Sequence, residues 1–391
     1  MEDYLVKSLN NIDQGVLDRI PQGFNLSETD RPDAILLRSK DLHEMEFPEN
    51  LKFIGRAGSG VNNIPLEKCS EKGIVVCNAP GANANGVKEL VALSMIMASR
   101  NIAEALDWTK SLTADDSLKS QVESGKKAFV GPELYGKTVG VIGLGEIGAL
   151  VANMCVDFGM KVYGYDPFIT VKHAWEVNRL IERSNDLAFL FANCDIISLH
   201  IPYNKDTDRM VSRELLAGAK PGLCLINLAR DGLVDYEALK EALDQDIISH
   251  YVVDFPDRHS LKLPKTINFP HLGASTPESE FNAGTMVVSS MVDYLKNGNI
   301  HNSVNFPDLD FGVCNSRQRL AVLHENIPNM IGQITQILAG LKINISRLSN
   351  KHKGNWAYTM IDLDDEISED ALALFRQITG VVRVRKLPAR A

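Results

Sequence analysis

Several familiar features are missing from this chain of 391 residues. Its six cysteines are scattered, and no two of them have the C-x-x-C spacing of a metal or redox site. No run approaches the roughly 20 apolar residues that cross a bilayer, and no basic segment followed by an apolar run opens the chain. We therefore expect reduced core cysteines, no metal, no membrane partner and a soluble, cytoplasmic protein.

Positive charge is also in short supply. The chain has 41 lysines and arginines against 50 aspartates and glutamates, a net charge of −9. A broad nucleic-acid or anionic-membrane surface needs clustered positive charge, so we expect no nucleic-acid partner and favour small-molecule chemistry. With 45% hydrophobic residues, a chain of this length can bury more than one core, which favours two or three domains.

The most specific motif is a glycine-rich turn, G-L-G-E-I-G, which follows a strand-like segment at 137–139 and opens a helix. Gly143 allows a tight turn, Gly145 lets backbone N–H groups approach a pyrophosphate, and Gly148 lets the helix pack closely on its strand. The pattern alone is weak, because glycines can serve packing only.

The surroundings of this turn strengthen the interpretation. Apolar residues at helical spacing follow it, and a second predicted strand at 161–165 ends in Asp166. A carboxylate at that strand tip accepts hydrogen bonds from the ribose hydroxyls and repels a 2′-phosphate. The sequence therefore predicts a Rossmann domain that binds NAD rather than NADP, with Glu146 and Ile147 among its contacts.

The chain before this turn is predicted to form an α/β unit of its own. Continuous apolar runs, typical of parallel strands buried on both faces, stand at 34–38, 51–56 and 74–78. Arg38 and Arg56 end two of these strands, at the sheet edge where ligands of such folds bind. They are candidates to hold an anion, although position alone equally allows two solvated surface arginines.

Two later strand ends carry side chains suited to catalysis. Further strands of the nucleotide unit are expected at 195–201, 222–227, 251–254 and 266–268. Arg230 follows one of them and can hold a carboxylate by two parallel hydrogen bonds. His271 follows the last, and histidine exchanges protons near neutral pH. Either residue alone could be a surface arginine or a satisfied histidine, but together beside NAD they indicate hydride transfer.

The C-terminal part forms a separate predicted module. Its strands are expected at 319–324, 343–346, 356–361 and 381–385, and its helices at 330–341 and 368–379. The order β-α-β-β-α-β is that of the ferredoxin-like fold.

Taken together, the motifs resemble those of the D-2-hydroxyacid dehydrogenases. The resemblance covers nearly the whole chain and rests on residues 55–63, 143–148, 227–230 and 270–276. The C-terminal module is similar to ACT domains, which sense amino acids. The fold class implied is α/β with two doubly wound parallel-sheet domains plus a ferredoxin-like α+β domain. The implied parts are a flavodoxin-like substrate domain of 1–88 and 283–304, a Rossmann NAD domain of 89–282, a linker of 305–316 and an ACT-like domain of 317–391.

By this resemblance, the chain oxidises D-3-phosphoglycerate to 3-phosphohydroxypyruvate with NAD, the first step of L-serine biosynthesis, as a homodimer or homotetramer. Arg230 would bind the substrate carboxylate and C2 oxygen, and His271 would be the general base. The remaining substrate contacts would be Arg38 and Arg56 on the phosphate, with Ser59 and Gly60. The cofactor contacts would be Gly143, Gly145, Glu146, Ile147, Gly148, Asp166, Ile201, Leu228, Ala229, Asp254, Gly273 and Ala274.

Two positions depart from the family pattern. The family pairs its histidine with a glutamate five residues after the aspartate matched by Asp254, but that position here is His259. A carboxylate partner orients an imidazole and raises its basicity. Asp257 is the candidate substitute and Asp254 its rival. Asp231 stands where the family usually has glycine, and its charge should moderate the preceding arginine.

The resemblance also implies feedback regulation. His324, Asn326 and Asn344 match positions that bind L-serine between paired ACT domains. Asn329 replaces a family glycine, and asparagine tolerates left-handed backbone geometry better than most residues. The alternative is a module that serves assembly only. Two other functions stay open: a D-2-hydroxyacid dehydrogenase with an unphosphorylated substrate, and an NAD-sensing binding protein like the dehydrogenase-like transcriptional corepressors.

Overall fold

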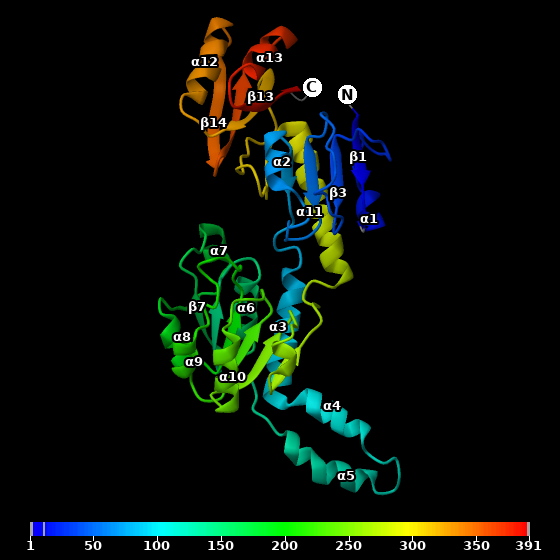
Figure 1. The fold of residues 1–391 in the computed structure, drawn as a ribbon, viewed down its shortest axis with the longest axis vertical. Helices are drawn as coiled ribbons and strands as arrows, with labels where there is room; N and C mark the ends of the chain where they lie inside the picture. Colours follow the sequence, from blue (N-terminus) through cyan, green and yellow to red (C-terminus); the bar gives the residue numbers. More distant parts are fainter. Residues whose placement is uncertain (1–2, 11, 389–391) are drawn as a thin grey trace. The chain divides into compact units, whose positions relative to one another are not determined.

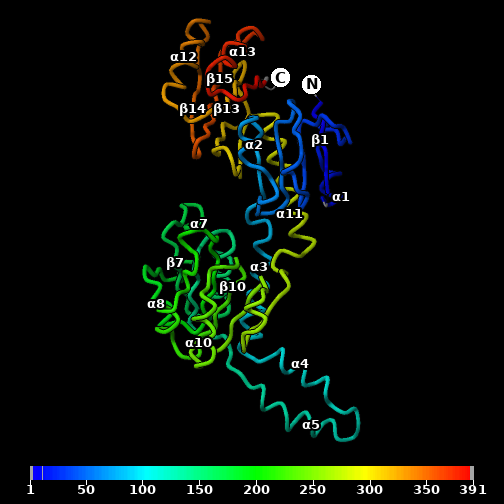
Figure 2. Tube along the Cα trace, in the orientation of Figure 1, coloured from blue at the N-terminus to red at the C-terminus, as the bar shows by residue number. Residues whose placement is uncertain are grey.

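The computed structural model describes residues 3–10 and 12–388. The chain divides into two compact units (Figures 1 and 2). The split unit consists of Met1–Ala82 together with Glu280–Ala391, and the central unit of Asn83–Ser279.

The first part of the split unit is a five-stranded parallel sheet in the order β2-β1-β3-β4-β5. This is the flavodoxin-like order, and the three predicted strands are confirmed. The elements are β1 (Tyr4–Ser8), α1 (Gln14–Leu17), β2 (Phe24–Leu26), β3 (Ala34–Leu37), β4 (Phe53–Arg56), α2 (Leu66–Glu71) and β5 (Val75–Cys77). The long helix α11 (Pro277–Asn297) packs on this sheet through Val287, Met291 and Tyr294.

The central unit is a seven-stranded parallel sheet in the order β12-β11-β10-β9-β6-β7-β8. The chain order reverses between β6 and β9, which is the switch point of a Rossmann fold. The strands are β6 (Thr138–Ile142), β7 (Lys161–Tyr165), β8 (Glu182–Arg183), β9 (Ile196–Leu199), β10 (Leu223–Asn227), β11 (Ile248–Val253) and β12 (Thr266–Asn268).

Helices cover both faces of this sheet, as the doubly wound prediction requires. One hydrophobic cluster lies under α3 (Ala84–Arg100) and α6 (Gly148–Asp157). A second cluster contains residues of α8 (Leu187–Asn193), α9 (Arg213–Ala217) and α10 (Tyr236–Asp244). The short segments α7 (Val171–Glu176) and η2 (Ser260–Lys262) follow β7 and β11.

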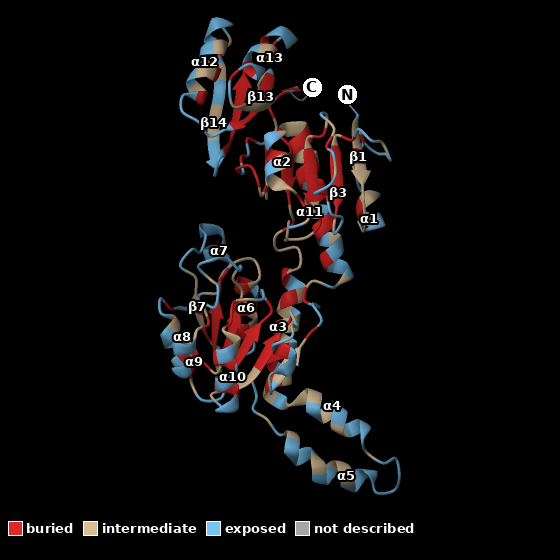
Figure 3. Cartoon of the chain, in the orientation of Figure 1, coloured by how far each residue is buried: buried red, intermediate tan, exposed pale blue. Residues whose placement is uncertain are grey.

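A helical hairpin leaves the central unit after α3. It consists of α4 (Ile102–Lys110), α5 (Leu118–Gly125) and η1 (Lys126–Phe129). Neither α4 nor α5 buries a residue in the described chain, as the absence of buried positions along both helices in Figure 3 indicates. The two arms of the hairpin contact each other through the rings of Trp108 and Phe129, whose centroids are 5.3 Å apart.

The C-terminal module is a four-stranded antiparallel sheet in the order β14-β15-β13-β16. Its elements are β13 (Gln318–Glu325), α12 (Met330–Gly340), β14 (Ile345–Lys353), β15 (Trp356–Leu363), α13 (Glu369–Arg376) and β16 (Val381–Pro388). The predicted β-α-β-β-α-β order is confirmed. One face of the sheet packs under α12 and α13 through Leu320, Val322 and Ile361.

The other face of this sheet is also buried. Leu323 and Tyr358 belong to the same hydrophobic core as Tyr294 of α11. The segment between α11 and β13 contributes Phe306 and Phe311 to that core. The C-terminal module therefore packs directly against the rest of the split unit.

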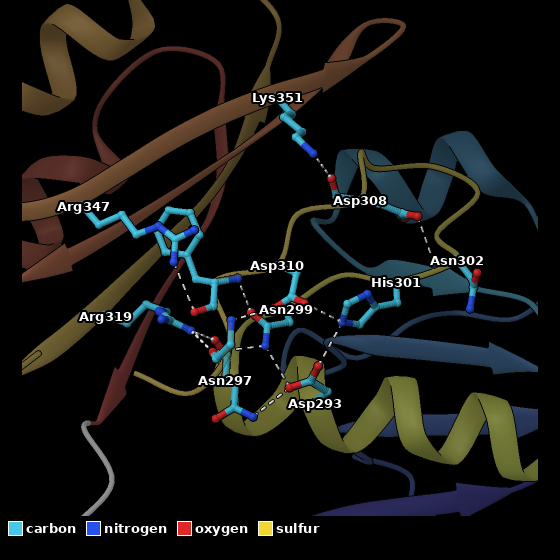
Figure 4. A network of polar contacts seen from close by, with 12 residues as sticks. Asp293, Asn297, Asn299, His301, Asn302, Asp308, Asp310, Arg319, Arg347 and Lys351 are labelled. Carbon is cyan, nitrogen blue, oxygen red and sulfur yellow. Dashed lines mark hydrogen bonds and ion pairs between the residues drawn. The ribbon is translucent and has the colours of Figure 1, made fainter. Parts of the chain in front are cut away.

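Buried arginines reinforce this packing. Arg319 of β13, fully buried, forms two hydrogen bonds with the carboxylate of Asp362, at 2.6 and 3.0 Å. Its Nη1 also donates to the carbonyl oxygens of Asn297 and Gly312 at 2.8 and 2.7 Å. Figure 4 shows this network beside Asp293 of α11, which accepts hydrogen bonds from Asn297 and Asn299 and lies 3.0 Å from His301 Nε2.

Two further donors complete the end of α11. Arg385 of β16 donates to the carbonyl oxygens of Tyr294 and Leu295 at 3.0 and 2.8 Å, and Tyr358 Oη donates to that of Gly298 at 2.7 Å. The last carbonyl groups of a helix have no partner within the helix. The C-terminal module supplies donors to three of these carbonyl groups, those of Tyr294, Leu295 and Asn297, so we infer that it helps to hold the end of α11 in place.

The six cysteines are free and buried, which confirms the prediction of reduced core residues. Over residues 3–10 and 12–388, no helix is long and apolar enough to cross a membrane. The same residues contain no group of three or more histidine, cysteine or acidic side chains arranged to hold a metal ion.

Candidate functional site

The three glycines of the turn after β6 have different surroundings. Gly143 has φ +90°, and a Cβ there would lie 2.5 Å from the carbonyl oxygen of His200. A Cβ on Gly148 would lie 1.8 Å from the carbonyl oxygen of Gly143. A Cβ on Gly145, in contrast, would meet no atom of the described chain within 4 Å. The fold itself requires the first and third glycines, whereas the second leaves open space over the turn.

Asp166, at the tip of β7, is tied to this turn. Its Oδ2 accepts the backbone N–H of Leu144 at 2.8 Å, and its Oδ1 accepts that of Phe168 at 2.8 Å. The carboxylate therefore has a fixed position beside the glycines. The sequence predicts a carboxylate at this position, which would bind the ribose hydroxyls and repel a 2′-phosphate.

His200, at the end of β9, is a residue that sequence reasoning missed. It packs under the turn, and its Nε2 lies 2.8 Å from Ser198 Oγ. Burial lowers the pKa of His200 to about 4, so the imidazole is neutral at neutral pH. The only sequence signal was its place at the carboxyl end of an apolar strand. Ile201, the predicted cofactor contact, follows it and is half-buried.

The loop with Arg230 is organised by Asn227, which is buried at the end of β10. Asn227 Oδ1 accepts the backbone N–H groups of Ala229 and Arg230 at 3.2 and 3.4 Å, and its Nδ2 donates to the Arg230 carbonyl at 2.9 Å. These bonds hold residues 227–230 in a tight turn. Leu228 is buried in this turn, and Arg230 is exposed. Arg230 Nη1 donates to the Ala229 carbonyl at 2.6 Å.

Asp231 forms its hydrogen bonds with residues other than Arg230. Its Oδ1 accepts the backbone N–H of Gly232 at 2.7 Å and the hydroxyl of Tyr236 at 3.2 Å. Within the described residues no ion pair joins Asp231 to Arg230. Its effect on Arg230 therefore stays a prediction.

The loop with His271 is held by Asp254, which is 1% exposed at the end of β11. Asp254 Oδ1 accepts the backbone N–H of Leu272 at 2.7 Å, and Oδ2 accepts that of Gly273 at 2.9 Å. Burial raises the pKa of the Asp254 carboxyl, an effect that these two bonds and the nearby His271 partly offset. His271 itself has φ +58°, a left-handed conformation that turns its side chain outward from the strand.

The exposed imidazole of His271 lies beside an aromatic ring. The centroids of the Phe255 and His271 rings are 4.7 Å apart. Asp257, the candidate partner, uses Oδ1 to accept the backbone N–H groups of His259 and Ser260 at 3.0 and 2.7 Å. In the part of the chain that the structure describes, neither Asp254 nor Asp257 hydrogen-bonds the imidazole.

Arg38 and Arg56, in the split unit, lie together. Residues Leu37 and Arg56 pair in the β3–β4 ladder, and Arg56 Nε donates to the carbonyl oxygen of Arg38 at 3.0 Å. Both side chains are partly exposed. The guanidinium of Arg38 forms an ion pair with Glu280, in the first turns of α11.

The loop after β4 lies against Arg56. Gly58 has φ +154°, and a Cβ there would lie 2.5 Å from Arg56 Nη1. Asn78 Nδ2 donates to the carbonyl oxygen of Ser59 at 2.6 Å. A Cβ on Gly60 would lie 3.7 Å from the same guanidinium nitrogen. The predicted substrate residues of this unit thus form one cluster at the carboxyl ends of β3 and β4.

The three candidate effector residues of the C-terminal module differ in exposure. His324 is buried, with Nδ1 2.7 Å from the Glu325 carbonyl and Nε2 2.8 Å from Thr359 Oγ1. Asn326 and Asn344 are exposed, and Asn344 Nδ2 donates to Asp364 at 2.6 Å. Asn329 has φ +61°, the left-handed geometry that its replacement of glycine predicted.

Comparison with known proteins agrees with this geometry. Residues 92–273 match the family model for the NAD-binding domain of D-isomer specific 2-hydroxyacid dehydrogenases. The chain is 38% identical over 325 residues to D-3-phosphoglycerate dehydrogenase of Methanocaldococcus jannaschii, covering 82% of this chain and 59% of that protein. It is 32% identical over 377 residues to the Mycobacterium leprae protein of the same name, covering 91% and 69%. The chain thus spans about three fifths of the first relative and two thirds of the second.

Solved structures give the same picture. The NAD+-bound 3-phosphoglycerate dehydrogenase of Entamoeba histolytica has a TM-score of 0.59 at 27% identity, covering 78% of this chain and 100% of that one. A D-2-hydroxyisocaproate dehydrogenase, at 20% identity and TM-score 0.62 over 77% of this chain and 99% of its own, shares the fold. The central unit is an NAD-binding domain, and NAD is its cofactor.

The different surroundings of Gly145 and Gly148 predict different effects of the same substitution. Gly148→Ala should destabilise the protein by about 1–3 kcal/mol or more, because the new methyl group meets the Gly143 carbonyl. Gly145→Ala should leave the melting temperature nearly unchanged but weaken NADH binding by about ten-fold, because the methyl group occupies the space over the turn. Thermal melts and NADH fluorescence titrations of both variants would measure this; equal melting temperatures, or unaltered NADH binding by Gly145→Ala, would contradict it.

Proposed function

Because the chain belongs to the D-2-hydroxyacid dehydrogenase family, we propose that it oxidises D-3-phosphoglycerate to 3-phosphohydroxypyruvate with NAD, the first step of L-serine biosynthesis. The observation that carries the choice of substrate is the pair Arg38 and Arg56, joined at the carboxyl ends of β3 and β4. Two guanidinium groups at one sheet edge suit a phosphate, which accepts several charge-assisted hydrogen bonds.

In the proposed reaction, the Arg230 guanidinium holds the substrate carboxylate and the C2 oxygen. Bound NAD supplies the hydride acceptor. His271, as the general base, accepts the proton of the C2 hydroxyl as the C2 hydrogen leaves as hydride, and the C2–O bond becomes a carbonyl. The open space over Gly145 and the fixed carboxylate of Asp166 fit the pyrophosphate and ribose of the cofactor.

The orientation of His271 has two proposed sources. The hydrogen bonds from Leu272 and Gly273 to Asp254 fix the backbone of its loop, and Phe255 packs beside the ring. Asp257 is the proposed carboxylate, and it would act through its charge because its Oδ1 already accepts backbone N–H groups. A nearby carboxylate favours the imidazolium that forms during the reaction.

We predict that His271→Asn lowers kcat by about 10² to 10⁴, as expected for a lost acid–base group, while NADH binding persists. Asp257→Asn should lower the apparent pKa of the histidine in the pH profile of kcat/KM, because the imidazolium loses a stabilising charge. Asp244→Asn is a matched surface control, since Asp244 pairs with Lys240 on the exposed face of α10. An unshifted profile in Asp257→Asn would remove that residue from the mechanism.

Glu280 complicates the phosphate site. Its carboxylate neutralises Arg38, so a phosphate must compete for that guanidinium. This ion pair is the observation that favours the second candidate, a dehydrogenase for an unphosphorylated 2-hydroxy acid. Arg56 meanwhile lies over Gly58 and is anchored through Nε to the Arg38 carbonyl, which leaves the pair prearranged for an anion.

Replacing Arg38 and Arg56 together with alanine decides between these candidates. We expect NADH binding to persist and the preference for D-3-phosphoglycerate over D-glycerate to disappear, a loss of about 10²-fold or more in the ratio of kcat/KM values. Arg31→Ala is a control on the same unit, since Arg31 is exposed on the loop before β3. A double variant that still prefers the phosphorylated substrate would show that the phosphate binds elsewhere.

Regulation by L-serine is the finer part of the proposal. Asn326 and Asn344 are exposed and offer amide groups to an amino acid, whereas His324 has both ring nitrogens occupied within the module. The two asparagines would therefore contact serine directly, and His324 would shape the loop that carries Asn326. Assembly as a homodimer or homotetramer is supported by α4 and α5, which bury no residue of their own chain in the described part.

L-Serine should inhibit the wild-type enzyme, and Asn344→Ala should be resistant because it loses an amide that faces solvent. Initial rates measured against rising serine concentration would test this. His352→Ala is the matched control, because His352 is exposed on β14 of the same module and should leave inhibition intact. Wild-type rates that stay constant in millimolar serine would leave assembly as the function of the module.

A further inference from the structure

Glu146 occupies an unexpected place for a carboxylate. It lies in the turn between Gly145 and Gly148, where the phosphates of a dinucleotide are expected. Its Oε1 accepts a hydrogen bond from Lys172 Nζ at 2.7 Å and lies 3.2 Å from His173 Nε2. Partial burial opposes ionisation of Glu146, but the hydrogen bond from Lys172 and the close approach of His173 outweigh it and lower the pKa of the carboxyl.

Both basic groups belong to the first turn of α7, the segment that follows Asp166. His173 is held in place by Thr170, the N-cap of α7, whose Oγ1 lies 3.1 Å from Nδ1 and accepts the His173 backbone N–H at 3.3 Å. Its other ring nitrogen therefore faces Glu146. The geometry is that of a built cluster, in which one carboxylate gathers two basic side chains.

The cluster of Glu146, Lys172 and His173 is close to Asp166, the carboxylate that is expected to bind the ribose hydroxyls. Asp166 is fixed by Leu144 of the same turn and by Phe168 of the segment that leads to α7. A 2′-phosphate on the ribose would carry a charge of about −1.5 to −2, and binding it requires available cations. Lys172 and His173 are basic groups close to Asp166, and both are paired with Glu146.

We propose that Glu146 is a second determinant of cofactor choice: it keeps Lys172 and His173 paired, so that a 2′-phosphate meets the charge of Asp166 without a free cation. Asp166 repels NADP, and Glu146 withholds the compensating positive charge. The inference rests on the use of NAD by the central unit and is independent of the substrate.

The test measures the dissociation constants of NADH and NADPH by fluorescence titration, which needs no substrate. Glu146→Gln keeps the shape of the side chain and releases the two basic groups. The ratio of NADPH affinity to NADH affinity should rise by about three- to ten-fold, the range expected when one partly exposed ion pair is exchanged for another. In the double variant Glu146→Gln/Asp166→Asn, the ratio of NADPH affinity to NADH affinity should rise further. The carboxylate that repels the 2′-phosphate is then neutralised, and the two basic side chains are free to bind it.

Two comparisons make the test specific. In a Lys172→Met/His173→Gln background, Glu146→Gln should no longer change the ratio, because no cation is left to release. Glu182→Gln removes the same charge from the ion pair with Lys161, 3.3 Å long, at the opposite end of β7, and should also leave the ratio unchanged. An unaltered ratio in Glu146→Gln alone, or a gain that persists without Lys172 and His173, would overturn the proposal. A failed assay with D-3-phosphoglycerate would not affect it.

Discussion

The hydrogen bonds from the Leu272 and Gly273 backbone to the buried carboxyl of Asp254 are the constraint on which the arrangement of this site depends. They fix the loop that presents His271. Asn227 does the same for the loop with Arg230. At each of these strand ends, one buried side chain accepts hydrogen bonds from the backbone N–H groups of a loop. The loop then holds its candidate catalytic side chain in a defined place.

Hydrogen bonds between a side chain at a strand end and a loop backbone occur in both units. Asp166 accepts from Leu144 of the glycine-rich turn, and Asn78 donates to Ser59. Loops at the carboxyl ends of parallel strands have no ladder partners of their own. Anchors at the strand ends therefore hold the loops of each unit in defined positions, and such preorganised groups stabilise a transition state.

Within the split unit, helix α11 connects the loop of Arg38 with the C-terminal module. Its first turns carry Glu280, which pairs with Arg38, and its last carbonyl groups accept hydrogen bonds from Arg319 and Arg385. Figure 4 shows how densely the polar groups are joined at that end, from Asp293 to Arg319.

Many strands of the two parallel sheets could be predicted from the sequence, and the candidate site residues could be placed at their ends, because both depend on local patterns. The apolar run Ala34–Leu37 and the glycine-rich turn are such patterns. Strand β1 was missed, since its apolar run is only three residues long (Tyr4–Val6) and only Val6 in it is buried. Strand β14 was expected at 343–346 and lies at Ile345–Lys353, because an exposed edge strand carries polar residues and no apolar run.

The parts of the site that could not be predicted involve residues far apart in the chain. Nothing in the sequence indicates that Glu280 lies on Arg38, or that Glu146 gathers Lys172 and His173. These pairs depend on how helices α11 and α7 lie on their sheets. Likewise, only the structure separates the half-buried His200 from the exposed His271.

The central claim is hydride transfer from C2 of a phosphorylated substrate. It is tested most directly by incubating the protein and NAD with D-3-phosphoglycerate that carries deuterium at C2, followed by mass spectrometry of the products. The account predicts that the deuterium appears in the reduced cofactor, in equal amount with 3-phosphohydroxypyruvate. Absence of labelled reduced cofactor, with label transferred instead from an unphosphorylated 2-hydroxy acid, would contradict it.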